Sequence, residues 1–212
     1  MVYVYVMEVS NLPDPKEQPQ MMTGLPDKRK EKILRFKQKK DRIQSLGASL
    51  LLDSVLKKHG FSMEQIRYNK HGKPEIDGFY FNLSHSYEMA VCAVSEKAPV
   101  GCDVEKIGKA PLKVASRYFC ENEIAHLESL GEEEKNAEFY RIWTMKESYM
   151  KMTGEGLGMG LDSVEIIFED PIKVMRSGNV CQCSIKEYEI PGYKLTICAQ
   201  ERDFYYHSSL LV

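Results

Sequence analysis

The sequence contains one short pattern twice, about a hundred residues apart, and this repeat constrains the fold more than any other feature. RIQSLGASLLL, which begins at Arg42, matches RIWTMKESYMK, which begins at Arg141, in its Arg, Ile, hydroxyl and Ser positions. YEMAVCA, from Tyr87, matches YKLTICA, from Tyr193, and the opening VYVMEV aligns with GCDVEK. Matches that keep their order at a slowly drifting spacing predict two copies of one subdomain.

Hydrophobic alternation and helical periodicity predict an α+β fold. We expect strands at residues 2–9, 65–68, 79–83, 89–94, 100–105, 163–168, 181–188, 193–199 and 204–211, the last four in an antiparallel arrangement. We expect helices at residues 27–58, 112–130 and 132–152, with Gly60 closing the first. With the repeat, this predicts a pseudo-dimer of two similar subdomains, residues 1–99 and 100–212, each a small, mostly antiparallel sheet packed with a long helix.

Composition excludes several classes of function. Hydrophobic residues make up 43% of the 212 residues and charged residues 28%, which is typical of a globular protein. The net charge of −2 gives no basic field for nucleic acid, and no signal peptide or membrane span is recognisable. The six cysteines form no CxxC pair, so we expect reduced thiols in a cytoplasmic protein rather than disulfides or a zinc site.

The segment GCDVEKI carries two carboxylates, Asp103 and Glu105, in an otherwise apolar strand. Side chains two positions apart on a strand share a face and lie roughly 6.5–7 Å apart. One interpretation is an edge strand with an acidic polar face. The other is half of a divalent-cation site, which needs a third oxygen ligand from elsewhere. In the alignment of the two copies, Glu105 corresponds to Glu8 in the first predicted strand.

The two long helices differ at one face. Ala48 and Leu52 in the first copy correspond to Glu147 and Lys151 in the second. Glu147 and Lys151 are one turn apart and share a face, so they could form a surface ion pair. The apolar residues of the first copy instead predict that this face is buried, which favours a role in a site.

With GCDVEKI followed by WTMKESYMK, the sequence resembles the 4′-phosphopantetheinyl transferases of the surfactin-activating (Sfp) type, in the holo-acyl-carrier-protein synthase superfamily. The family pattern is a Gly-x-Asp-x-Glu strand, then Trp-Ser/Thr-x-Lys-Glu-Ala/Ser-x-x-Lys on a helix. The resemblance covers residues 25–157, including FNLSHS, KHGKP and the basic LPDKRKEK segment. Family members consist of two similar halves, as the repeat predicts.

The resemblance implies an enzyme that transfers the 4′-phosphopantetheine arm of coenzyme A to a serine of an acyl or peptidyl carrier protein and releases adenosine 3′,5′-bisphosphate. It implies a Mg²⁺ site formed by Asp103, Glu105 and Glu147, with the pyrophosphate of coenzyme A as a further ligand. Lys151 would stabilise the phosphates as a catalytic residue. The active site would lie at the interface of the two subdomains, with the nucleotide on the side of residues 1–99 and the metal and carrier protein on the side of residues 100–212.

Further residues carried over by the resemblance would bind coenzyme A. These are Lys28, Lys32, Lys73, Ser84, His85 and, again, Lys151. The alternative for Lys28 and Lys32 is a solvated helix face, and a one-residue insertion near Lys30 leaves their register open. Ser84 and His85 are neighbours in a strand and point to opposite faces, which excludes a serine nucleophile activated by that histidine.

The resemblance also implies that Glu123 is the general base for the serine hydroxyl, although such a glutamate is also common in the first turn of a helix. It places the carrier protein against residues 109–119, through Pro111, Leu112, Tyr118 and Phe119. The expected state is a monomer with no nucleic-acid or membrane partner. Fatty acid, polyketide and nonribosomal peptide carriers remain equal alternatives.

Two other classes of function compete with this hypothesis. A protein that only binds coenzyme A or a carrier would not need clustered carboxylates, which are costly to bury. A phosphatase or nuclease would release phosphate or cut strands without any carrier protein. A mass measurement on an apo-carrier incubated with coenzyme A and Mg²⁺ separates these classes from a transferase.

Overall fold

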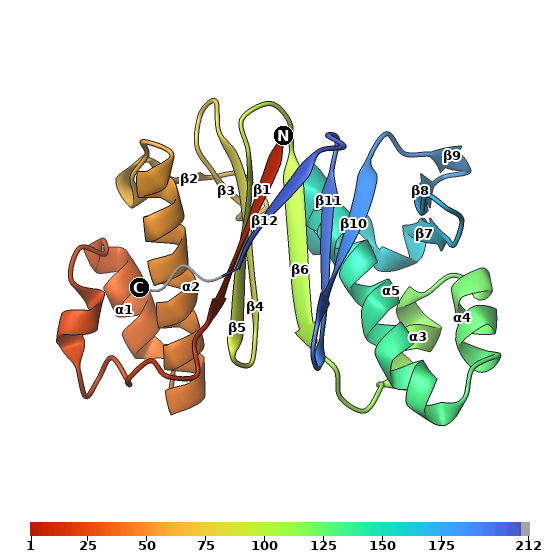
Figure 1. Ribbon diagram of the computed structural model, residues 1–212, viewed down its shortest axis with the longest axis horizontal. Helices are drawn as coiled ribbons and strands as arrows, with labels where there is room; N and C mark the ends of the chain where they lie inside the picture. The colour runs from red at the N-terminus through yellow and green to blue at the C-terminus, as the bar shows by residue number, and fades with distance from the viewer. Residues whose placement is uncertain (209–212) are drawn as a thin grey trace.

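Two β-sheets pack face to face at the centre of the molecule, and helices cover both outer faces (Figure 1). This computed structural model describes residues 1–208, with the side chains of residues 157, 158 and 208 outside the description. Within residues 1–208, no helix is both long and apolar enough to cross a membrane.

The first half of the chain contributes two helices and three strands of a four-stranded sheet. Its elements are β1 (Val2–Glu8), α1 (Asp27–Arg35), α2 (Lys39–Lys58), β4 (Tyr80–Ser86) and β5 (Met89–Ser95). The strand order is β12-β1-β5-β4, and the strand β12 (Phe204–Ser208) from the end of the chain joins it. β12 runs parallel to β1, whereas the sequence predicted an antiparallel arrangement for this last strand.

The second half builds the other sheet in the same way. Its elements are β6 (Val100–Lys106), α5 (Glu132–Thr153), β10 (Ser184–Ile190) and β11 (Tyr193–Ala199), with the strand order β10-β11-β6. In both halves a strand is followed by a long helix and then by a hairpin, and the hairpin's second strand pairs antiparallel with the first strand. The chain is therefore α+β, and its two central sheets are short and mostly antiparallel.

The strand register corrects one detail of the sequence repeat. Val4 and Val6 face the layer between the sheets, and Glu8 follows them by alternation on the same side of β1. Glu105 instead lies on the side of β6 that faces α5, where it lines a pocket with Glu147. The alignment of Glu8 with Glu105 is therefore wrong by one residue, and a shift of one residue reverses every side chain of a strand.

Three apolar layers hold the elements together. The layer between the sheets is made by alternate residues of four strands: Val2, Val4, Val6, Val91, Ala93, Val100, Cys102, Val104, Tyr193, Leu195, Ile197 and Ala199. A second layer lies between the first sheet and α2, and a third between the second sheet and α5. Because four strands are covered on both faces, they have nearly continuous apolar sequences, as in YVYV and AVCAV.

Two predicted helices are each divided in the structure. The helix predicted at 27–58 is interrupted between α1 and α2, where Arg42 donates hydrogen bonds to the carbonyl oxygens of Phe36 and Lys37. The helix predicted at 112–130 is divided into α3 (Leu112–Tyr118) and α4 (Glu121–Glu128). At the second break the backbone nitrogen of Cys120 donates to Glu123, which caps the start of α4. No Pro or Gly marks either position.

The short elements also differ from the prediction. The strand predicted at 65–68 is reduced to β2 (Arg67–Tyr68), which pairs with β3 (Pro74–Glu75), and residues 63–65 form a 3-10 turn. A small sheet of β7 (Val164–Ile167), β8 (Lys173–Arg176) and β9 (Asn179–Val180) packs beside α5, and of these only β7 was predicted. The predicted residues beyond 208 in the last strand lie outside the described residues.

Candidate active site

The close packing of α5 on β6 creates a pocket between them. Gly101 allows it, because a Cβ atom at this position would come within 2.0 Å of the Ser148 carbonyl oxygen and 2.4 Å of the Met152 nitrogen, both in the helix backbone. Asp103 and Glu105 follow Gly101 on the same strand face. They line a cavity of about 320 Å³ with Glu147 and Lys151 of α5. The structure thus brings all three predicted metal ligands and the predicted catalytic lysine into one pocket.

Lys151 joins the helix to the strand. Its Nζ lies 2.6 Å from Asp103 Oδ1 and 3.2 Å from Ser84 Oγ. Burial alone would lower the pKa of Lys151, but Asp103, with smaller contributions from Cys102 and Glu147, outweighs it, so the pKa is raised. Lys151 therefore stays protonated and brings one positive charge to the three carboxylates. It is not a surface partner of Glu147.

The carboxylates are crowded and poorly solvated. Burial, and then repulsion from Asp103, raise the pKa of Glu147 to about 7, and the same two causes raise the pKa of Glu105. Asp103 is buried, with 3% of its surface exposed, and its Oδ2 has no hydrogen-bond partner in the described structure. The pocket has more negative charge than Lys151 neutralises, so a cation would be favoured there.

The donor set suits a hard divalent cation, because carboxylate oxygens are the protein ligands that Mg²⁺ prefers. The orphaned Oδ2 of Asp103 adds to this fit. In the described part of the chain, however, no three His, Cys, Asp or Glu side chains stand together in a metal-binding arrangement. Asp103, Glu105 and Glu147 share a pocket without forming a closed ligand set, and the Lys151 ammonium occupies Asp103 Oδ1.

The edge of the first sheet forms one wall of the pocket. Asn82, Ser84 and Ser86 alternate along β4, and their side chains meet the backbone of β6. The Ser84 hydroxyl also donates to Asp103, and the Ser86 hydroxyl to Glu105. Ser84 was predicted at the site, but Asn82 and Ser86 were not. Their alternation in FNLSHS, within a buried strand, is the signal that could have identified them.

His85 alternates with Ser84 and Ser86 along β4, is exposed to solvent and lines the same pocket. The pKa of His85 is lowered, mainly because neighbouring protein atoms desolvate the ring. The positive charges of Lys151, Arg29 and Lys32 lower it further. Arg29 is half-buried, donates from Nε to Ser49 Oγ at 2.7 Å, and has its pKa lowered by burial. The basic segment of α1 therefore lies near His85, and Arg29 is less exposed there than Lys28 and Lys32.

Lys28 and Lys32 are exposed on α1. Lys73, by contrast, has a fixed position: its Nζ donates to the carbonyl oxygens of Lys151, at 2.6 Å, and Met152, at 3.1 Å. Burial lowers the pKa of Lys73. It lines two cavities of about 310 and 300 Å³, and the second of these also includes Glu147 and Lys151. The loop of KHGKP is thus tied to the end of α5 beside the pocket.

The structure does not bring Glu123 to this pocket. The side chain is fully buried and forms an ion pair with Lys146, which is also fully buried. Its carboxylate also accepts hydrogen bonds from the backbone nitrogens of Cys120 and Ile166, each at 2.8 Å. A carboxylate with these partners has no path to a serine hydroxyl of another protein, so the prediction of a general base is corrected to a structural role.

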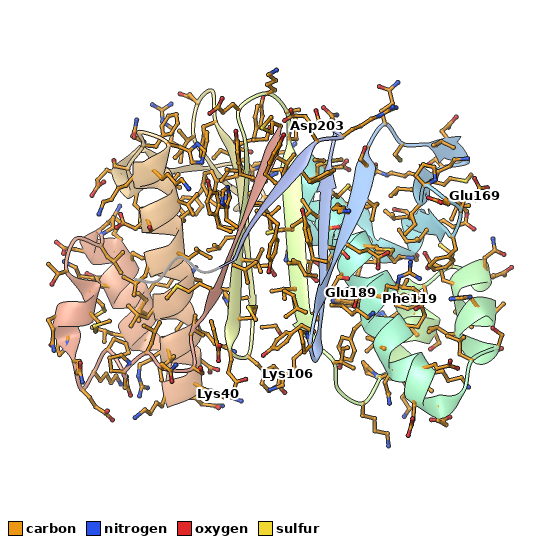
Figure 2. All side chains as sticks on the ribbon, viewed as in Figure 1. Lys40, Lys106, Phe119, Glu169, Glu189 and Asp203 are labelled. Carbon is orange, nitrogen blue, oxygen red and sulfur yellow. The ribbon has the colours of Figure 1, made fainter. Side chains whose placement is uncertain are left out.

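Only part of the predicted carrier-docking segment, residues 109–119, is exposed to solvent. Phe119 is buried and stacks on Phe139, with ring centroids 5.2 Å apart, so it belongs to the core beneath α3 (Figure 2). Pro111 and Leu112 are exposed, and Leu112 has 50% of its surface accessible. Pro111 also lines a cavity of about 240 Å³, and Glu105 and Trp143 line both this cavity and the pocket.

Comparison with known proteins gives consistent matches. Residues 99–198 match the model of the 4′-phosphopantetheinyl transferase superfamily. The chain is 32% identical over 198 residues to 4′-phosphopantetheinyl transferase Sfp of Bacillus subtilis, covering 89% of this chain and 88% of that protein. It is 33% identical over 185 residues to the transferase gsp of Aneurinibacillus migulanus, covering 84% and 78%. A solved holo-(acyl-carrier-protein) synthase from Bacillus anthracis overlays with a TM-score of 0.42 at 15% identity, covering 48% of this chain and 94% of that one.

Proposed function

We propose a function on the basis of the family, since this chain belongs to the 4′-phosphopantetheinyl transferases of the Sfp type. In this proposal it transfers the 4′-phosphopantetheine arm of coenzyme A to a serine of an apo acyl or peptidyl carrier protein. The serine Oγ bonds to the phosphorus that carries the pantetheine arm. The bond from this phosphorus to the bridging oxygen breaks, adenosine 3′,5′-bisphosphate leaves, and the serine proton is released. The pocket shared by Asp103, Glu105, Glu147 and Lys151 is the observation that carries the proposal.

In this proposal the pyrophosphate of coenzyme A lies beside Lys151. The lysine is protonated and fixed by Asp103 and Ser84, so its charge is available without reorganisation when the phosphate bond breaks. Phosphoryl transfer depends mainly on positioning and on charge neutralisation, which suits a fixed ammonium. Lys151 is therefore assigned to both binding and catalysis.

Asp103, Glu105 and Glu147 would hold a Mg²⁺ ion, with further ligands from the pyrophosphate and water. When bound, the ion would supply charge stabilisation for the phosphoryl group and the departing oxygen. Before the ion binds, Lys151 keeps one oxygen of Asp103 in place, and the second oxygen of that carboxylate remains without a partner.

The nucleotide part of coenzyme A would extend across the first half of the chain. Its 3′-phosphate would meet the basic segment of α1, with Lys28 and Lys32 exposed and Arg29 more deeply placed beside His85. The adenine would lie near the loop of Lys73, whose position on the α5 carbonyls is fixed. Residues 1–99 and 100–212 would thus both contact the substrate, with the active site at their interface.

The carrier protein would dock on the exposed surface of α3. Leu112 is exposed, and the neighbouring Pro111 lines a cavity together with Glu105, so a partner helix lying there would bring its serine toward the pocket. The basic residues Lys109 and Lys113 on the same segment would attract an acidic partner.

A mass measurement tests the proposal. The protein is incubated with coenzyme A, Mg²⁺ and an apo-carrier, and the carrier is then weighed. We expect the carrier to gain the mass of one phosphopantetheine group, with no gain when the carrier serine is replaced by alanine or when a chelator removes the metal. Tight coenzyme A binding with no mass gain on any carrier of a panel would instead indicate a binding protein. Phosphate release without a carrier would indicate a phosphatase.

A further inference from the structure

The contact between β4 and β6 joins the two sheets through side chains. Both are edge strands, and they do not pair through a backbone ladder. Instead, the backbone nitrogen of Cys102 donates to Asn82 Oδ1 at 3.0 Å, that of Val104 to Ser84 Oγ at 3.3 Å, and that of Lys106 to Ser86 Oγ at 3.2 Å. Three alternate residues of β4 thus bind three alternate nitrogens of β6.

Two of these three residues also bind a carboxylate of the pocket. Ser84 Oγ donates to Asp103 Oδ1 at 2.9 Å, and Ser86 Oγ donates to Glu105 Oε2 at 2.7 Å. Each hydroxyl accepts a backbone N–H from the residue that follows its carboxylate. The hydroxyl proton is therefore directed at the carboxylate, because the lone pairs already face the N–H group.

The two serines have little freedom to turn away. Ser84 is 6% exposed and Ser86 is 8% exposed. Each carboxylate is thereby bound through one oxygen to a fixed hydroxyl, and in Asp103 the other oxygen, Oδ2, has no protein partner. Hydrogen bonds that orient a ligating carboxylate in this way typically influence metal affinity strongly.

We propose that Ser86, together with Ser84, is a positioning residue that orients Glu105 and Asp103 toward the divalent cation. The same hydroxyls accept hydrogen bonds from the backbone N–H groups at the edge of β6. This inference rests on the proposed metal-dependent transfer. Asn82 makes the same backbone contact one step along the strand without touching a carboxylate, so sealing the edge does not by itself require a hydroxyl. The serines occur where a carboxylate needs a donor.

The test is direct metal binding by the full chain in the presence of coenzyme A and without a carrier protein. Mn²⁺ is the probe, followed by its paramagnetic signal, and Mg²⁺ is then measured by competition. We expect Ser86→Ala to weaken Mn²⁺ binding about tenfold, and Ser86→Thr, which keeps the hydroxyl, to bind within about threefold of the unmodified protein. In the transfer assay, Ser86→Ala should need about ten times more Mg²⁺ for half its maximal rate and regain most of that rate at saturation.

Ser95→Ala is the matched control. Ser95 is fully buried in the neighbouring strand β5, donates to the Glu201 carboxylate, and accepts the backbone N–H groups of Lys97 and Ala98. It reproduces the bonding of Ser86 away from the pocket. We expect Ser95→Ala to lower the melting temperature and to leave Mn²⁺ affinity unchanged.

Each outcome decides between positioning and a purely structural role. Equal Mn²⁺ affinity of Ser86→Ala and the unmodified protein would overturn the inference, and so would the absence of Mn²⁺ binding to the unmodified protein. A loss of affinity in Ser86→Ala that Ser86→Thr restores would support it. If that pattern appears but no carrier protein gains mass, the proposed transfer fails while the positioning role stands.

Discussion

Glu123 and Lys146 form an ion pair in which neither side chain has any exposed surface. The pair connects three elements, because Glu123 also binds the backbone of Cys120 at the start of α4 and of Ile166 in β7. The ammonium of Lys146 lies 5.2 Å from the centroid of the Phe119 ring, which adds a cation–π contact. A pair this deeply buried is strongly coupled, since either charge alone would be very unfavourable.

Glu123→Gln should therefore unfold more easily. Removal of one charge leaves Lys146 buried and unpaired, and the amide group cannot accept the Cys120 N–H through its nitrogen. We expect a loss of about 3 kcal/mol in the free energy of unfolding, measured by urea denaturation. The folded fraction should still transfer phosphopantetheine, because Glu123 does not line the pocket. The double variant Glu123→Gln with Lys146→Met should recover most of the loss. A stable but inactive Glu123→Gln would return Glu123 to the catalytic group.

The sequence repeat aligns Glu147 of α5 with Ala48 of α2. Ala48 is buried against the first sheet, so the fold accepts a small apolar residue at this position. Glu147→Ala should fold and should have nearly no transfer activity, because two carboxylates would remain for the cation. A variant that stays active, or one that does not fold, would contradict the assignment.

The same variant should change how stability depends on pH. Burial and Asp103 raise the pKa of Glu147 to about 7, so the folded protein without metal holds a proton that the unfolded chain releases above its ordinary pKa near 4.5. The contribution of Glu147 to stability therefore falls as pH rises from about 4.5 to 7, and this contribution should be absent from the pH dependence of Glu147→Ala. Thermal unfolding of both proteins without ligand, from pH 5 to 8, measures this difference. Parallel curves would mean that Glu147 is ionised throughout.

At the scale of elements, the contact of α5 with β6 sets the geometry of the pocket. Gly101→Ala would place a Cβ atom against the helix backbone, which cannot move as a flexible side chain does. We expect a loss of about 1–3 kcal/mol in stability and a fall of about 100-fold in transfer rate, because α5 must move away and take Glu147 and Lys151 with it. At Gly108 the nearest atom to an added Cβ is Tyr140 Oη, at 3.4 Å. Gly108→Ala should therefore stay close to the unmodified protein in both measurements, and equal effects at both glycines would remove the special role of Gly101.

The elements that carry the site were the most predictable ones. β6 and α5 lie within about one residue of their predicted bounds, residues 100–105 and 132–152. Strand geometry predicted that Asp103 and Glu105 lie side by side, whereas their grouping with Glu147 in one site was implied by the family resemblance. The division between α1 and α2 was not predictable, because it depends on Arg42, whose guanidinium reaches Asp14 as well as the Phe36 carbonyl oxygen. No local signal in FKQKK opposes a helix.

The role of Glu123 could not be read from the sequence for a related reason. A glutamate in the first turn of a helix is normally exposed, and only the positions of α5 and β7 enclose this one. The contribution of Ser86 was also missed, since it depends on β4 lying beside β6, two strands from different sheets. Contacts within an element follow from periodicity, whereas contacts between elements require the assembled fold.

At the scale of the whole molecule, the two sheets behave as one body because they share an apolar layer. The residues of this layer come from both halves of the chain. The two sheets therefore cannot separate from each other without exposing valine, leucine and isoleucine side chains to water. The active site depends on this arrangement, since β4 contributes its hydroxyls from one sheet and β6 its carboxylates from the other. We therefore expect the two halves to unfold together.

The chain also returns to the first sheet through β12, which brings two tyrosines from different sheets into contact. Tyr206 of β12 stacks on Tyr188 of β10, with ring centroids 4.9 Å apart at an angle of 26°. Replacing both by leucine in a double-mutant cycle should give a coupling energy of about 0.5–1.5 kcal/mol in urea unfolding. Tyr205 is the matched control, because it alternates to the other face of β12 and contacts Tyr3. The cycle of Tyr188 with Tyr205 should give a coupling near zero. Equal coupling in both cycles would show that the sheets are not held together by this contact.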